Sequence, residues 1–382
     1  MAFTVSNKLA EKNSTGFDYL RIFLAVFVLF MHSLRVVNGD WMADAMANSH
    51  FHGIFNSILP AFFALSGFLV AGSLQRNNLI TFAGLRIARI VPALAVEILL
   101  SALIIGPLFT ELTVGGYFSA KEFYLYFLNI LGIIHLELPG VFLHNPFPNI
   151  VNLSLWTIPY ELECYLALGS LALIFRRSRI LILLVTVLLC LVGVYKSVHL
   201  HGISYYYEPG TEHHFSGRAL VVGFLCGVNI YLWRDKIPYW NWLGWGCLAL
   251  GIFLASFYRL QHVAVIPLAY ATVWIGLKNV PRSWVINNGD YSYGVYLFAA
   301  PIQQMLATYE RLRLWWVNFL LALVCSVLYA AFSWHWVEHP VLKRKPQLTQ
   351  FTNACNARLS SYLAKAIPWL RPAKDAPAQA GG

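Results

Sequence analysis

Long apolar runs recur along the whole chain, and they constrain its fold more than any other feature. The runs hold 16 to 23 residues with few charges, and about 18 are enough for a helix to cross a bilayer. Of the 382 residues, 58% are hydrophobic and 12% are charged, whereas soluble domains carry about 25% charged residues. No series of short alternating strands suggests a barrel. We therefore predict an all-α fold, a polytopic membrane bundle of about ten transmembrane helices. The predicted spans are residues 19–37, 54–73, 90–109, 155–175, 180–195, 218–233, 242–258, 262–277, 291–308 and 314–336.

A further apolar segment, residues 123–136, is too short to span a bilayer. The arginines that follow residue 73 and the run "RRSR" at 176–179 both mark cytoplasmic loops. Two crossings between these loops return the chain to the same side, whereas three do not. The stretch 137–153 contains no Lys or Arg, as expected of an outer loop. The short segment is therefore predicted to be re-entrant or interfacial.

The basic residues also predict the orientation of the chain. Lys and Arg assigned to the cytoplasmic side outnumber those outside by more than two to one, as the positive-inside rule expects. The net charge of +10 therefore reflects membrane orientation and argues against nucleic-acid binding. The predicted layout is a cytoplasmic N-terminus at 1–17, a transmembrane domain at 18–340 and a cytoplasmic tail at 341–382. The first apolar run lacks a signal-peptide cleavage site and is predicted to remain as a span.

The tail and the outer loops have distinct compositions. The stretch "FTNACNARLSSYLAKAIPWL" at 351–370 is amphipathic and predicts a helix on the inner membrane surface. The end of the chain, "PAKDAPAQAGG", has the composition of a disordered segment. The outer loops 38–53, 137–153 and 196–217 are rich in His, Tyr, Asn and Pro. Such side chains suit sugar binding, although an interfacial aromatic belt has a similar composition.

The first span contains "RIFLAVFVLFMH", in which Arg21 and His32 stand at the two ends of ten uncharged residues. Their eleven-residue offset corresponds to about 1100° of helix rotation, so both project from nearly one face, about 16 Å apart along the axis. Arg21 is placed at the cytoplasmic mouth, where Asp18 at i−3 can pair with it. An ionisable group within a span is costly unless it is paired or hydrated. Both residues are therefore site candidates, the alternatives being a snorkelling boundary charge and a core histidine.

Two further segments carry site candidates, one near the middle of the second span and one at the cytoplasmic side. In "FFALSGFLV", Ser66 and Gly67 narrow the second span, which suits either close helix packing or a cavity beside His32. In "RIARIVP", Arg86 and Arg89 share a helix face just before a span predicted to begin near Pro92. Two guanidiniums at a helix N-terminus would form an anion site suited to a phosphate-bearing ligand. Positive-inside anchoring is the alternative.

The segment "SLWTIPYELECYL" places carboxylates inside a predicted span. Glu161 and Glu163 lie about 200° apart around the helix, so they cannot both face one cavity. Thr157 shares the face of Glu161, at a depth that could meet His32. A carboxylate there could orient an imidazole or raise its basicity. The alternative is a carboxyl group hydrogen-bonded for packing.

Other catalytic motifs are missing from the sequence. There is no nucleophile elbow, Walker loop, zinc-protease motif or dinucleotide fingerprint. The six cysteines are not spaced as metal ligands. We therefore expect no metal and no bound cofactor.

Taken in order, these segments resemble the acyltransferase-3 family of bacterial membrane acyltransferases, which O-acylate sugars and polysaccharides. "FDYLRIFLAVFVLFMHS" is similar to its first block, with Arg21 and His32, and "FFALSGFLV" to its second. "RIARIVP" and "SLWTIPYELECYL" are similar to the next two, the latter with Trp156, Thr157 and Glu161. "SYGVYLFAAP" and "WVEHP" resemble the last two. Many members carry a histidine where this chain has Ala299, so that role cannot be transferred.

The resemblance implies ten spans in the bacterial inner membrane and an acyl-CoA donor, usually acetyl-CoA. The expected reaction transfers the acyl group to a hydroxyl of an extracytoplasmic sugar, polysaccharide or lipo-oligosaccharide. His32 and Glu161 are the expected catalytic residues, and Arg21, Arg86 and Arg89 the expected donor-binding residues. His32 would either carry the acyl group or act as general base.

A glycan or lipid-linked sugar transporter or flippase is the competing class, and a sensor or assembly scaffold is a third. The sequence shows no internal repeat, which argues against a transporter because many transporters are built from duplicated halves. The sequence names neither the acceptor nor the acyl chain, and it gives no oligomeric state.

Overall fold

The computed structural model describes residues 3–11, 14–174, 178–201 and 216–366, and these are almost entirely helical or in short connections. Each of the ten predicted spans corresponds to a helix. The described elements of the bundle are α2 (Gly16–Asn38), α4 (His52–Arg76), α5 (Leu79–Leu100), α9 (Ile158–Ile174), α10 (Arg179–His201), α11 (Gly217–Leu232), α12 (Asn241–Ala255), α13 (Gln261–Gly276), α15 (Ser292–Ala307) and α16 (Trp315–Ser333). The predicted all-α membrane bundle is confirmed.

Five helical segments among the described residues are long and apolar enough to cross a membrane. They are Gly16–Asn38, His52–Arg76, Leu79–Phe109, Arg179–His199 and Trp315–Lys343. The other five predicted spans are helices of 15 to 17 residues. At about 1.5 Å per residue these are shorter than the hydrocarbon thickness, so their crossing depends on the surrounding bundle.

Two of the longest segments contain π-helical turns. α5 continues through a π-helical turn at Ser101–Ile105 into α6 (Gly106–Phe109), and α16 continues through Trp334–Glu338 into α17 (His339–Lys343). Insertions of this kind often occur at functional sites. The second one places Glu338 in the protein interior, where its side chain is 2% exposed.

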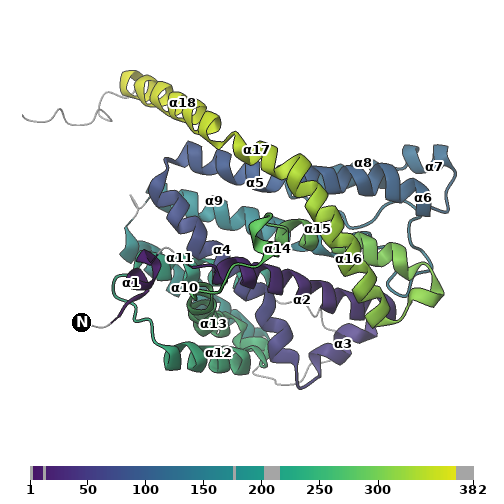
Figure 1. Ribbon diagram of the computed structural model, residues 1–382, viewed down its shortest axis with the longest axis horizontal. Helices are drawn as coiled ribbons and strands as arrows, with labels where there is room; N and C mark the ends of the chain where they lie inside the picture. Colours follow the sequence, from purple (N-terminus) through teal and green to yellow (C-terminus); the bar gives the residue numbers. More distant parts are fainter. Residues whose placement is uncertain (1–2, 12–13, 175–177, 202–215, 367–382) are drawn as a thin grey trace, which may run out of the picture.

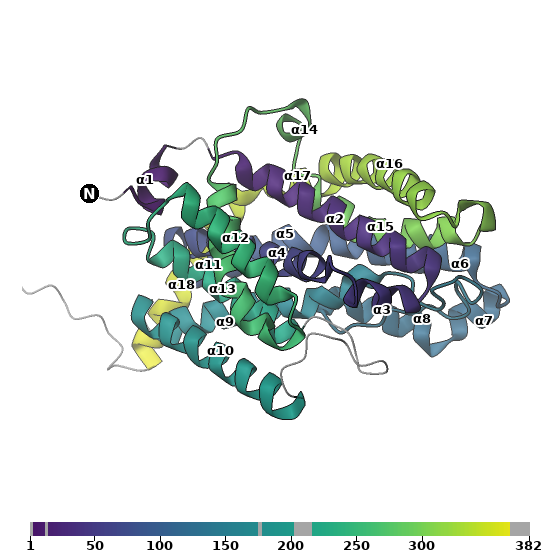
Figure 2. The same cartoon turned by 90° about the horizontal axis from the view of Figure 1, so that it is seen from below.

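The segment 123–136 does not form a spanning helix. It contains the end of α8 (Lys121–Tyr126) and a 3₁₀ turn at Phe127–Leu131, and the chain is then irregular. The connection also holds α7 (Val114–Ser119). Figures 1 and 2 both place α6, α7 and α8 at the end of the bundle away from α1 (Val5–Ala10). This segment therefore adds no crossing, as predicted.

The two ends of the described chain lie at the same end of the molecule. Figures 1 and 2 show α1 and α18 (Lys345–Ala366) at one end, and α3 (Trp41–Ala47) and α7 at the other. This arrangement agrees with an even number of crossings; which side each end faces remains a prediction. α18 packs on α5 through a Thr81–Thr352 hydroxyl pair at 2.7 Å and an Asn78–Asn353 bond at 2.6 Å. The predicted disordered end and the arginines at 176 and 177 lie outside the described residues, as does most of the loop 196–217.

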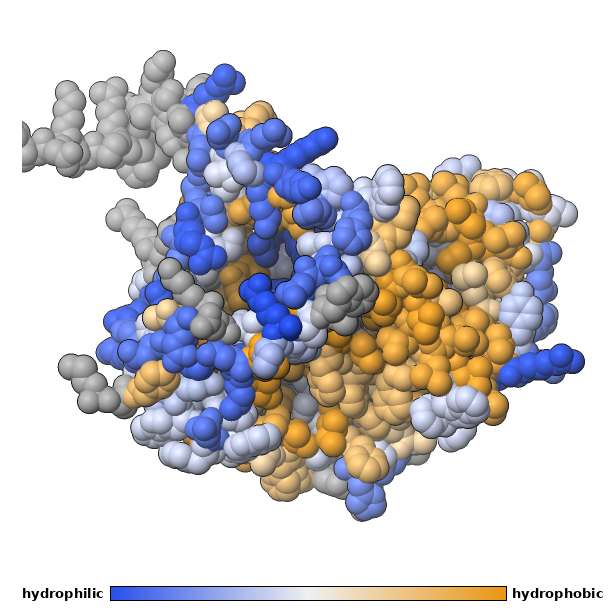
Figure 3. All heavy atoms as spheres, viewed as in Figure 1, coloured by the Kyte–Doolittle hydropathy of each residue, from blue (hydrophilic) through white to orange (hydrophobic). Residues whose placement is uncertain are grey.

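Small residues bring the inner helices close together. α4 packs along α11, where a side chain at Gly67 would collide with the carbonyl of Phe224 and one at Gly227 with the carbonyl of Ala64. Peripheral helices instead expose apolar residues, and on α10 these include Leu184, Leu188 and Leu191. Figure 3 shows a broad hydrophobic surface beside a hydrophilic end of the molecule. Apolar surface on this scale indicates contact with lipid.

Candidate active site

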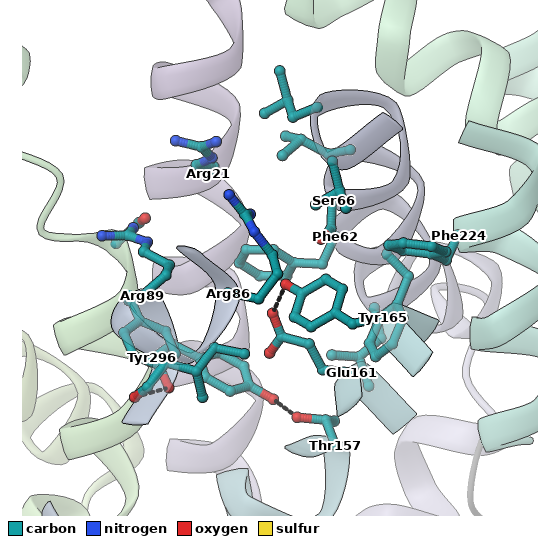
Figure 4. Close-up of a pocket in the computed structure, with 18 residues that line it drawn as sticks. Arg21, Phe62, Ser66, Arg86, Arg89, Thr157, Glu161, Tyr165, Phe224 and Tyr296 are labelled. Carbon is teal, nitrogen blue, oxygen red and sulfur yellow. Dashed lines mark hydrogen bonds between the residues drawn. The ribbon is translucent and has the colours of Figure 1, made fainter. Parts of the chain in front are cut away.

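Three predicted donor residues line one cavity, called the inner cavity because the predicted topology assigns it to the cytoplasmic side. The cavity has a volume of about 160 Å³ and also contains Glu161 and Ser66. Figure 4 shows Arg21, Arg86 and Arg89 gathered on one side of it, with Glu161 and Tyr165 beside Arg86. The rest of its wall is mostly apolar or aromatic and comes from α4, α5, α9, α11 and α15. These residues include Leu59, Phe62, Leu69, Phe224, Tyr293 and Tyr296.

The arginines do not lie at a helix N-terminus, so that part of the prediction was wrong. α5 begins at Leu79, where Asn78 caps the helix by accepting a hydrogen bond from the Thr81 amide. Arg86 and Arg89 therefore lie about two and three turns inside the helix. The position of Pro92 suggested a start near residue 90, but the helix continues through this proline. The pair shares a helix face, as its spacing predicted.

A carboxylate that was not predicted, Asp290, holds two of these arginines. Its Oδ2 accepts from Arg89 at 2.5 Å and from Arg21 at 3.1 Å. Arg89 also pairs with Glu338 at 3.1 Å. Burial of Asp290 favours its neutral form, but Arg89 and Arg21 outweigh this effect and hold the pKa of its carboxyl group below the ordinary value. This ion network joins α2 and α5 to the residue just before α15 and to the π-helical turn that follows α16.

Arg86 differs from Arg89 in its partners. It makes no ion pair with any described residue, and its buried Nε has no hydrogen-bond acceptor. Its guanidinium lies 5.9 Å from the centre of the Tyr165 ring. Lys345, the first residue of α18, is the next cation nearby: burial and the charges of Arg86 and Arg89 lower its pKa. Arg86 is therefore the arginine of this cavity whose charge is available to an anion.

Glu161 and His32 line different cavities. The Glu161 carboxyl accepts a hydrogen bond from the Tyr165 hydroxyl at 2.5 Å, and Thr157 pairs with the Tyr296 hydroxyl at 2.7 Å. Both bonds are visible in Figure 4. The anticipated contact between Glu161 and the His32 imidazole is not formed. Glu163 is exposed, as the helix rotation predicted.

His32 lines a second cavity of about 160 Å³, called the outer cavity because the predicted topology assigns it to the extracytoplasmic side. Its neighbours there include Arg35, His52, Asn56 and Trp156. The buried Nδ1 of His32 has no hydrogen-bond partner among the described residues. His52 is instead held by Asn56 at 2.6 Å. An imidazole with an unused buried nitrogen beside an open cavity suits proton or group transfer.

The two cavities meet at Leu59, whose side chain lines both. Two adjacent residues lie on either side of this boundary: Trp156 lines the outer cavity and Thr157 lines the inner one. Residues of α4 and of the 3₁₀ turn at Leu153–Thr157 thus lie between the charged inner cavity and the imidazole.

The remaining supporting residues fall close to where they were expected. Asp18 lies 3.7 Å from Arg21, a longer approach than that of Asp290. Ala299 is buried in an apolar cluster with Ala25 and Leu29, so no polar group replaces the histidine that many family members have there.

Three acidic residues were missed. Asp290 directly precedes "YSYGVYL", and Glu338 lies within "WVEHP". Both segments had been noted, but no role was given to their acids. Glu97 is fully buried in α5 and accepts from Ser101 and Asn152, each at 2.8 Å. The signal for all three was an acid within or beside an apolar run, the criterion that selected Glu161.

The fold and these two neighbouring cavities, one lined by arginines and the other by a histidine, are those of an enzyme built within the membrane. A family model described as an acyltransferase domain matches residues 14–335. The chain belongs to this acyltransferase-3 family and is a membrane O-acyltransferase.

Two relatives cover nearly its whole length. Nodulation protein 10 of Rhizobium leguminosarum bv. viciae is 27% identical over 376 residues, 90% of this chain and 97% of that protein. An O-acetyl transferase of Shigella phage Sf6 is 26% identical over 356 residues, 88% and 98% of the two chains. No solved structure matches the chain.

Proposed function

We propose that this enzyme moves an acyl group, in the first instance acetyl, from cytoplasmic acyl-CoA to a hydroxyl of an extracytoplasmic glycan. The observation that carries the proposal is the junction at Leu59 between a cation-lined cavity and the cavity of His32. Acyl-CoA has an anionic end and a narrow acyl end, which fits this sequence of environments. The bacterial inner membrane, with both termini cytoplasmic, is the location that this direction of transfer requires.

In the proposed reaction, the acceptor oxygen attacks the thioester carbonyl while the His32 imidazole takes the hydroxyl proton. The carbon–sulfur bond then breaks, and the CoA thiolate leaves and receives a proton. In the alternative mechanism, the His32 imidazole first attacks the thioester carbonyl and displaces the CoA thiolate. His32 then transfers the acyl group to the acceptor hydroxyl. Glu161 would act on the donor side, where its carboxyl group lies with Tyr165 and Arg86.

Mass spectrometry of surface and secreted glycans tests this function directly. A strain that lacks the gene is expected to lose an acetyl or longer acyl mass from one glycan, and the wild-type gene should restore it. The His32→Ala gene should fail to restore it. An unchanged glycan profile in the deletion strain would contradict the proposal.

Removing Arg86 should weaken donor binding. We expect Arg86→Ala to raise the acetyl-CoA KM by about 10- to 100-fold, because a hydrogen bond to a charged group contributes about 1.5–3 kcal/mol. The change in kcat should be small. The measurement is the rate of CoA release by purified protein in lipid nanodiscs. Arg76, exposed at the end of α4, provides the control: Arg76→Ala should leave the KM unchanged. An unaltered KM for Arg86→Ala would remove Arg86 from the donor site.

The size of Leu59 should control the acyl chain that passes between the cavities. Leu59→Ala is expected to raise the ratio of kcat/KM for butyryl-CoA over acetyl-CoA about tenfold, within the range that a few methylene groups provide. Leu59→Trp should lower both rates by closing the junction. Leu69→Ala, which widens the inner cavity away from the junction, is the matched control and should leave the ratio unchanged. The same ratio in Leu59→Ala as in wild type would place the acyl path elsewhere.

A further inference from the structure

A third cavity opens on the outer side, next to the cavity of His32. It has a volume of about 480 Å³. Arg35, Leu153 and Trp156 line both, so the two are continuous along one wall. Arg218 lines the far side of the third cavity. Its described lining includes two arginines and no Asp or Glu.

The positive charge of this cavity is only partly neutralised. Arg35 bonds to Asp40 at 2.8 Å, but that carboxylate is 74% exposed and the buried Nε of Arg35 has no partner. Arg218 is exposed and makes no ion pair with any described residue. It belongs to the first turn of α11, whose amide groups add positive partial charge at the same wall. Clefts lined by one sign of charge concentrate ligands of the opposite sign.

Aromatic side chains complete the wall between the arginines and His32. The Trp156 and Tyr160 rings lie 5.9 Å apart, and Gly217 allows the Tyr160 ring to lie against the start of α11. The guanidinium of Arg35 lies 4.7 Å from the centre of the Phe147 ring. Flat apolar faces of this kind suit the faces of sugar rings, while the arginines offer hydrogen bonds to an oxyanion.

We propose that the acceptor is an acidic glycan, which binds an anionic group between Arg35 and Arg218 and presents a nearby hydroxyl to His32. This inference deepens the proposed function and rests on it. The anionic group is a carboxylate of the sugar or a phosphate attached to it, because both match guanidinium geometry.

The test uses wild-type protein in nanodiscs and three acceptor probes. These are a galacturonate trimer, its neutral methyl ester, and a galactose trimer with a phosphate at its reducing end. Binding of each probe is measured by calorimetry, and acetyl transfer from acetyl-CoA is measured separately. Wild type should bind at least one anionic probe ten or more times tighter than the ester. Preference for the galacturonate identifies a carboxylate, and preference for the capped trimer identifies a phosphate.

Arg218→Gln should remove most of this preference, and Arg311→Gln, which alters an exposed arginine outside the cavity, should keep it. Equal binding of the ester and both anionic probes by wild type, or no binding of any, would overturn the inference. An anionic preference in Arg218→Gln equal to that of wild type would also overturn the inference. If the anionic preference is present but no probe gains acetyl and no CoA is released, the proposed acyl-CoA function fails while the anionic site stands.

Discussion

Replacement of His32 by alanine is expected to lower kcat for acyl transfer by about 10²- to 10⁴-fold, the usual contribution of a positioned acid or base. His32 lines the cavity that borders both the junction at Leu59 and the wall of Arg35 and Trp156. Arg35 of the same span also lines this cavity, but its guanidinium stays protonated and cannot accept the proton. The measurement is the initial rate of CoA release in nanodiscs, with the acylated product identified by mass spectrometry.

Two other histidines serve as comparisons. His50 is exposed outside the cavity, so His50→Ala should retain the wild-type rate. His52 lines the same cavity but is bonded to Asn56, so its replacement should cost much less than that of His32. A His32→Ala rate within twofold of wild type would end the proposed role of His32.

A single-turnover experiment without acceptor distinguishes the two forms of the mechanism. A histidine that carries the acyl group should release CoA in a burst equal to the amount of enzyme. A histidine that acts only as a base should release CoA slowly under the same conditions.

Replacement of Asp290 by asparagine should be the most destabilising single change near the inner cavity. The isosteric amide leaves Arg21 and Arg89 without the carboxylate that both contact. Removing one partner of a buried ion pair costs about 3–5 kcal/mol, and we expect about 3 kcal/mol here because Asp290 is 23% exposed. The measurement is the free energy of unfolding in detergent micelles.

Asp40→Asn is the matched control. Asp40 also pairs with an arginine, at 2.8 Å from Arg35, but its side chain is 74% exposed, so its loss should cost less than about 1 kcal/mol. Removing Arg89 and Asp290 together, as Arg89→Leu with Asp290→Leu, should be less costly than the sum of the single changes. Equal destabilisation by Asp40→Asn and Asp290→Asn would contradict the assigned role of the network.

The same network predicts a pH dependence. The folded-state pKa of Asp290 is lowered, so its ionised form stabilises the fold above the unfolded-state pKa of about 3.9. This contribution is lost as the pH falls through the folded-state pKa. Wild type should therefore lose stability below about pH 4, and Asp290→Asn should lack that part of the loss.

The relative orientations of many site residues could be predicted, because they depend on the geometry of single helices. The offset between Arg21 and His32, the shared face of Arg86 and Arg89, and the opposed faces of Glu161 and Glu163 follow from the helical repeat. Helix boundaries were harder to predict from the sequence. Pro92 resembled a start signal, whereas α5 begins eleven residues before position 90 because Asn78 provides the cap.

Hydropathy and charge along the chain were sufficient to predict a helical membrane bundle and the helices that compose it. These properties are local, since a bilayer selects each apolar segment by its own length and composition. Tertiary packing decided which site residues meet. Arg86 and Arg89 are equivalent in the sequence. Of these two, only Arg89 pairs with Asp290 and Glu338, which lie some 200 or more residues away along the chain. Glu161 was likewise separated from His32, because Leu59 of another helix lies at the boundary between their cavities. Contacts between distant segments depend on how the helices pack together, and no local pattern encodes them.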